Sequence, residues 1–135
     1  MKLRGDGAFL DLELSERGPE DTPADEDLLV NVTVDVKGFT AADQNWIVAR
    51  EWSGFLVELR TLVESRQGRA TLVAVVPDEL RIEFFSTDRA GHMAVKGQVH
   101  RTTADGFDLQ LQFGFAFEPD TLPRVLSELQ AFSTG

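Results

Sequence analysis

Residues 107–117 alternate without a break between apolar side chains and polar or small ones. The apolar set is Phe107, Leu109, Leu111, Phe113, Phe115 and Phe117; the other set is Asp108, Gln110, Gln112, Gly114 and Ala116. Successive side chains of a strand point to opposite faces, so this pattern predicts a strand with one apolar face and one solvent face. Residues 118–132 then change to a helical period. The junction predicts an antiparallel sheet whose apolar face is covered by helices, and it indicates nothing about chemistry.

The first third of the chain predicts further strands. Ala8–Leu14 places leucines on one face and acidic residues on the other, and residues 30–37 alternate valines with polar residues. Lys37-Gly38 supplies a turn, because glycine tolerates a positive φ angle. Residues 39–48 are the least regular, and we expect one broken strand there with a bulge near Asp43.

Two amphipathic helices are predicted, one mid-chain and one C-terminal. The mid-chain helix begins near Glu51, ends before Gly68, and has apolar positions at Trp52, Phe55, Leu56, Leu59, Leu62 and Val63. The C-terminal helix is expected to be capped by Asp120 or Thr121, with Pro123 in its first turn. It buries Leu122, Val125, Leu126, Leu129 and Phe132.

The remaining strands complete the expected fold class. Residues 70–76 form an apolar run that we interpret as a central strand, and alternating segments follow at 80–84 and 93–99. Short turns join these strands to the strand at 107–117, which predicts an antiparallel meander. We therefore expect an α+β fold in which residues 1–135 form a single domain: an antiparallel β-sheet of six to eight strands with two helices packed on it.

The composition restricts the compartment. The chain has no cysteine, which excludes disulfides, thiolate zinc sites and cysteine nucleophiles, and fits a reducing environment. Lys2 and Arg4 are followed by Asp6 and not by an apolar run, so we expect no signal peptide. No apolar run approaches the roughly 20 residues that span a bilayer. We expect a cytoplasmic protein that does not enter a membrane.

The net charge of −10 disfavours nucleic acid and anionic membranes as partners, since phosphate would repel the chain. Half of the excess lies in residues 15–27, which carry six acidic residues and one arginine. The acidic residues are Glu16, Glu20, Asp21, Asp25, Glu26 and Asp27. The segment is interpreted either as a solvated, mobile loop or as an acidic arm that binds a basic partner.

Candidate catalytic and metal-binding residues fail simple tests. His92 and His100 are eight residues apart on one predicted strand, about 26 Å, so they cannot share a metal. Ser53 lacks the Gly-x-Ser-x-Gly pattern of a nucleophile elbow. Gly5-Asp6-Gly7 lacks the preceding strand and third glycine of a dinucleotide site. We predict no catalytic residue, no metal, no cofactor and no enzymatic activity.

Two surface features are candidates for binding a protein. Trp46 is either an exposed interface aromatic or a residue that plugs the end of the sheet. Ala94, Gly114 and Ala116 point outward and form a shallow patch, which either receives another surface or is covered by a loop or helix of the chain itself.

The order of segments resembles the bacterial WapI-like immunity proteins and allied uncharacterised small domains. The resemblance lies in residues 5–12 (GDGAFLDL), 28–32 (LLVNV), 38–41 (GFTA), 55–59 (FLVEL), 79–84 (ELRIEF), 91–95 (GHMAV) and the helix ending at Phe132. Residues 42–51 depart from the pattern, and the acidic loop is particular to this chain. The resemblance implies a non-enzymatic protein that neutralises a toxin domain, and it transfers no functional residue.

Two classes of function therefore stay open. The first is a protein-binding module, of which an immunity protein that binds a basic toxin domain is one form. Its candidate partner-binding residues are the six acidic residues of the loop and Trp46. The second is a small-ligand-binding domain with a pocket between the sheet and the helices. Because the assigned inward positions are almost all apolar, we favour a filled core and the first class.

Overall fold

The computed structural model describes residues 1–23 and 26–133, within which eight β-strands and two α-helices form. The strands are β1 (Lys2–Gly5), β2 (Ala8–Arg17), β3 (Leu28–Val36), β4 (Phe39–Ile47), β5 (Arg69–Val73), β6 (Leu80–Ser86), β7 (Met93–Thr102) and β8 (Asp108–Phe117). The helices are α1 (Ala49–Ser65) and α2 (Leu122–Gln130), and short 3₁₀ turns flank α2 on both sides. The predicted α+β class, with one mid-chain and one C-terminal helix, is confirmed.

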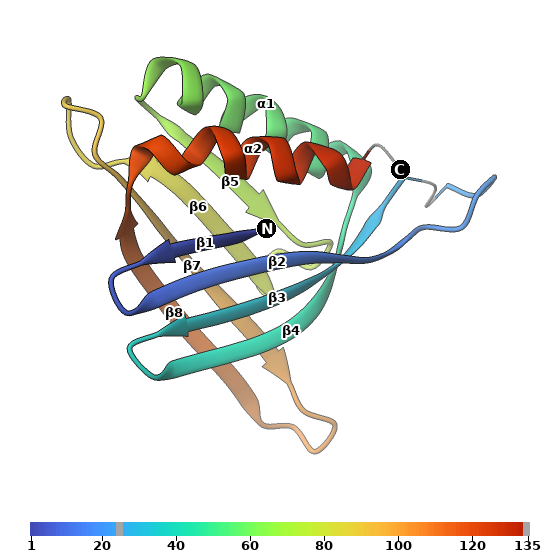
Figure 1. Cartoon of the computed structure of the whole chain (residues 1–135). Coiled ribbons are helices and arrows are strands. Elements are labelled where there is room, and N and C mark those ends of the chain that lie inside the picture. Colours follow the sequence, from blue (N-terminus) through green and yellow to red (C-terminus); the bar gives the residue numbers. More distant parts are fainter. Residues whose placement is uncertain (24–25, 134–135) are drawn as a thin grey trace.

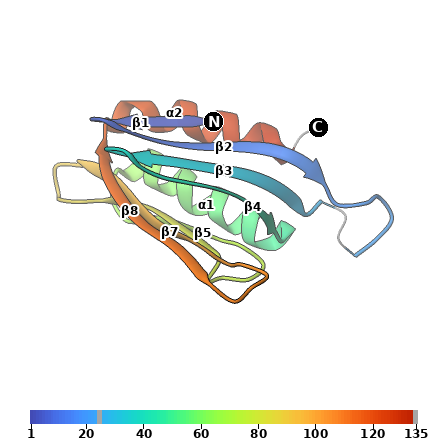
Figure 2. The same ribbon diagram turned by 90° about the horizontal axis from the view of Figure 1, so that it is seen from below.

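The strands form two sheets, so the prediction of one sheet is wrong. Sheet 1 has the order β1-β2-β3-β4 and sheet 2 the order β5-β6-β7-β8, and every pairing is antiparallel. The chain passes through α1 between them, and the two apolar faces then pack against each other (Figure 1). Seen from below, the sheets are separate layers (Figure 2). The meander predicted for the second half is confirmed as sheet 2.

One continuous core joins both sheets and both helices. Its most buried members include Leu10, Leu12, Val32 and Val34 of sheet 1, Leu72, Ile82, Phe84 and Val95 of sheet 2, and Phe55, Leu59, Val125 and Leu129 of the helices. Helix α1 packs on β5 and β6, and α2 lies beside α1 along one side of the sheets (Figure 1). The helices therefore close a side of the core that the two sheets leave open.

Three local predictions in the strands need correction. β4 runs unbroken along β3, and the register shift lies in β2, between Leu14 and Glu16. The alternation of β4 looks irregular because its inward positions include the polar residues Asp43 and Asn45. β5 is an edge strand and not a central one; it is apolar because α1 packs on it. β1 was not predicted, because its four residues are too few to show a period.

The predicted cap of the C-terminal helix is absent. Thr121 occupies the N-cap position, but its side chain makes no capping hydrogen bond. Its hydroxyl donates instead to the carbonyl oxygen of Glu118, at 2.7 Å. Residues 119–121 form a 3₁₀ turn before the α-helix, and the Thr121 hydroxyl bonds within that turn and not to the first N–H groups of α2. Pro123 lies in the first turn of α2, as predicted.

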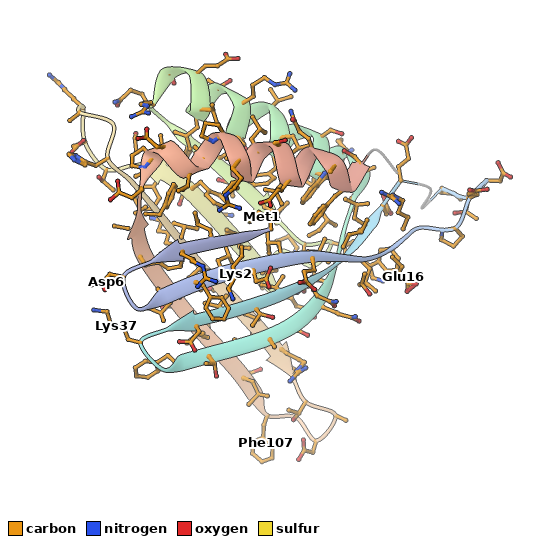
Figure 3. All side chains as sticks on the ribbon, viewed as in Figure 1. Met1, Lys2, Asp6, Glu16, Lys37 and Phe107 are labelled. Carbon is orange, nitrogen blue, oxygen red and sulfur yellow. The ribbon has the colours of Figure 1, made fainter. Side chains whose placement is uncertain are left out.

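The two ends of the strand at 107–117 differ in burial. Phe113 and Phe117 are buried, whereas Phe107 and Leu109 are 65% and 48% exposed, contrary to the prediction that they point into the core. The reason is geometric. The β7–β8 hairpin extends beyond β4, the last strand of sheet 1, and Phe107 lies at its tip (Figure 3). The inner face of the hairpin is left uncovered there.

Phe113 also fills a gap in the neighbouring strand. It lies opposite Gly97 of β7. A Cβ atom at Gly97 would be 2.9 Å from the Phe113 ring, so the ring takes the space that a side chain there would need. Aromatic packing across a strand glycine restores the contacts that the glycine lacks.

We predict that Phe113→Ala lowers the free energy of unfolding by about 3–5 kcal/mol, because it leaves a cavity in the core and uncovers Gly97. Gln112→Ala, on the exposed face of the same strand, should change it by about 0.5 kcal/mol or less. Urea melts of the two variants measure the difference. Equal midpoints would contradict the assignment of faces.

Candidate partner-binding surfaces

The acidic segment begins inside a strand. Ser15–Arg17 end β2, and residues 18–27 connect β2 to β3. The described part of this β2–β3 loop, residues 18–23 and 26–27, extends away from the two sheets (Figure 1), with Glu16 at its base (Figure 3). Glu16, Glu20, Asp21 and Glu26 are exposed. Asp25 lies outside the described residues.

Asp27 differs from the other acidic residues because it holds a helix end. Its carboxylate accepts a hydrogen bond from the main-chain N–H of Ala49, the first residue of α1, at 2.8 Å. The N-cap residue, Val48, has no side chain able to do this. A carboxylate at a helix N-terminus satisfies one unpaired donor and interacts favourably with the helix dipole. Asp27 therefore ties the end of the loop to α1.

The structure brings Trp46 and Glu16 onto one row of the outer face of sheet 1. Leu29 of β3 lies between them, paired with Glu16 on one side and Trp46 on the other. The Trp46 side chain is 37% exposed. The main-chain carbonyl oxygen of Trp46 accepts a hydrogen bond from the N–H of Val75. Val75 and Val76 are themselves exposed. An apolar patch thus lies beside the base of the acidic loop.

The two histidines form separate surface pairs with aspartates. His92 Nδ1 lies 2.7 Å from Asp88, and His100 Nε2 lies 3.2 Å from Asp108 of the neighbouring strand. The hydrogen bond with His92 lowers the pKa of Asp88. The pKa of Asp108 is lowered mainly by the hydrogen bond from the Thr102 hydroxyl and also by the hydrogen bond with His100. The described residues hold no group of three or more potential metal ligands.

The outer face of sheet 2 contains the predicted patch of small residues. Ala94 pairs with Ala116 across β7 and β8, and Gly114 pairs with Lys96. Beside the patch, the buried carboxylate of Glu83 lies 3.4 Å from Arg69 and 3.5 Å from Lys96. The ion pairs of Glu83 therefore connect β6 to β5 and to β7 on this face.

A groove opens where the β7–β8 hairpin extends past β4, and we call it the mouth groove. It is lined by residues 39–43 of β4, by Val99 and Arg101 of β7, and by residues 108–111 of β8, with a volume of ≈ 580 Å³. Phe39, at its rim, is 71% exposed. This groove was not predicted, because the alternation of β7 and β8 assigned Val99, Leu109 and Leu111 to a buried face.

One ion pair crosses the mouth groove from sheet to sheet. Asp43, an inward-facing residue of β4, lies 3.6 Å from Arg101 of β7. The Asp43 side chain is only 15% exposed, whereas Arg101 remains more than half exposed. Leu109 pairs with Arg101, and Leu111 with Val99. The groove thus combines an apolar floor with the Asp43–Arg101 ion pair.

Comparison with protein families assigns the chain to a class. The sequence model of the immunity protein WapI-like family matches residues 2–134, and the chain belongs to this family. The resemblance stated from the sequence is therefore confirmed. Searches of the curated proteins and of the solved structures found no match. Neither helix in the described residues is long and apolar enough to cross a membrane.

We predict that Asp27→Ala lowers the free energy of unfolding by about 1 kcal/mol, since an N–H at the start of α1 loses its partner. Glu20→Ala, in the same loop but exposed and without that contact, should be neutral within about 0.5 kcal/mol. Thermal melts followed by circular dichroism compare the two. A neutral Asp27→Ala would show that the bond to Ala49 contributes nothing.

Proposed function

We propose that this protein is a non-enzymatic immunity protein that neutralises a bacterial toxin domain by binding it stoichiometrically. The match to the immunity family over residues 2–134 carries the proposal. Exposed apolar side chains beside acidic groups support it, in the mouth groove and around Trp46. The space between helices and sheets, where a small ligand would have bound, is occupied by the apolar core.

The charge of the chain suggests the chemistry of the partner. A net charge of −10 favours a basic protein over nucleic acid or an anionic membrane. The exposed carboxylates of Glu16, Glu20, Asp21 and Glu26 would attract such a partner, and Trp46 offers an aromatic contact beside them. The absence of cysteine suits a cytoplasmic site of action.

The test uses the toxin domain encoded by the gene next to that of this chain, with its catalytic residue inactivated for purification. We expect a 1:1 complex by light scattering, and we expect co-expression of this chain to restore growth of cells that make the active toxin domain. A neighbouring domain that neither binds nor loses toxicity would overturn the proposed function.

We predict that the acidic loop acts on the rate of association. Replacing Glu16, Glu20, Asp21 and Glu26 with their amides should slow association with that domain about tenfold or more at low salt, and leave dissociation nearly unchanged. The difference should shrink above about 0.1 M salt, where screening acts over about 10 Å. Stopped-flow fluorescence measures both rates. Asp27 is kept, because it bonds to α1.

A matched variant controls for net charge. Glu64, Asp78, Glu79 and Glu118 are exposed residues outside the acidic loop, and their amides change the charge by the same amount. This control should slow association clearly less. Equal slowing by both variants would mean that net charge alone attracts the partner and that the loop has no special role.

A further inference from the structure

The edge of β4 leaves main-chain groups without partners. In an antiparallel pair, residues alternate between those that bond to the neighbouring strand and those that point away. The Trp46 carbonyl points away from β3, since it accepts the N–H of Val75. The register of β4 with β3 has no shift, so the main-chain N–H and C=O groups of Gln44, Ala42 and Thr40 also point away from β3, toward the free edge. In the part of the chain that the structure describes, no hydrogen bond reaches the outward N–H of Thr40 or Ala42.

This free edge has a defined length. At one end the bond from Val75 to Trp46 closes it, and at the other the Lys37-Gly38 turn begins. Residues 39–44 remain, about 20 Å of strand. They contain neither lysine nor proline, which commonly protect exposed strand edges. Only Asp43 serves as an inward charge, and Arg101 neutralises it.

An apolar floor lies beside the same edge. Because the β7–β8 hairpin extends past β4, Leu109 and Leu111 present their inward-facing side chains where sheet 1 has no further strand. Elsewhere in sheet 2 the equivalent positions, such as Phe113 and Val95, are covered and buried. Sheet 1 is therefore one strand too narrow to cover the hairpin.

We infer that the mouth groove accepts an extended β-strand from the basic partner domain, which pairs with β4 as a fifth strand of sheet 1 and covers Leu109 and Leu111. Strand addition of this kind draws affinity from main-chain hydrogen bonds and specificity from alternate side chains. Apolar side chains of the incoming strand would face the floor. This inference rests on the proposed function and specifies where the partner binds.

Charge decides between a partner and a second copy of this chain. Each copy carries a net charge of −10, and Asp43, the acidic side chain that points into the groove, is already paired with Arg101. Two copies would repel each other through this net charge, whereas a strand with lysine or arginine would be attracted. The occupant is therefore a basic segment of a different protein.

Amide hydrogen exchange, read by NMR on the wild-type protein, tests the inference directly. The N–H groups of Thr40 and Ala42 should exchange at least tenfold more slowly in the complex with the inactivated neighbouring toxin domain than in the free protein. The N–H of Gln44 is already bonded to the Asp43 side chain and should change less. A complex in which Thr40 and Ala42 exchange unchanged would overturn the inference while leaving the proposed function intact.

Two pairs of variants test the edge and the floor separately. Ala42→Pro removes one outward N–H without touching the bonds to β3, and should weaken binding at least tenfold; Ala42→Ser keeps the N–H and should bind like wild type. Leu109→Ser should also weaken binding tenfold, whereas Val57→Ser, at an exposed apolar residue of α1, should not. Unchanged affinity of both Ala42→Pro and Leu109→Ser would contradict the inference.

The remaining outcomes separate the alternatives. Slow exchange at Thr40 and Ala42 in the isolated protein, together with the mass of a dimer, would show that a second copy occupies the edge and would overturn a basic partner as occupant. Failure of the wild-type protein to bind the neighbouring domain would overturn the proposed function, and the inference with it.

Discussion

The burial of two apolar sheet faces against each other is the interaction on which the rest of this structure depends. Neither four-stranded sheet could leave its valine, leucine and phenylalanine face in water, and facing each other they form one core with the helices. Where β1 meets β8 the contact is close. A Cβ atom at Gly5 would lie only 2.7 Å from the Ala116 carbonyl oxygen. Glycine thus permits the sheets to approach at this edge, while the β7–β8 hairpin leaves the mouth groove open beyond β4.

The sequence predicted what depends on neighbouring residues and missed what depends on distant ones. Both helices and most strands followed from periodicity, because amphipathic spacing is set within a few residues. The division into two sheets depends on which apolar faces meet, and no local pattern encodes that. Phe107 and Phe113 share one alternation, yet the first is 65% exposed and the second buried. Their difference is set by where β4 lies, some sixty residues earlier in the chain.

The candidate binding surfaces also depend on residues that are distant in sequence, and local patterns predicted them only in part. Composition alone identified the acidic loop, but it could not distinguish Asp27 from its neighbours, since the role of Asp27 depends on Ala49 of α1. Trp46 stood alone in the sequence, and only strand register places it in a row with Leu29 and Glu16. The mouth groove left no sequence signal that could be separated from a buried strand, because it arises from a mismatch between hairpin length and sheet width.

The two surfaces proposed for the partner lie at opposite ends of β4 and would act on different steps of binding. Phe39 and Trp46 are separated by seven residues of strand, about 24 Å. Exposed carboxylates act through space before contact, so under the proposal the acidic loop would change how often the partner arrives. Main-chain pairing and apolar burial begin only after contact, so the mouth groove would determine how long the partner stays. Since the two surfaces share no residue, losses of binding free energy at each should add. An acidic chain with a narrow sheet can thus combine fast capture with slow release.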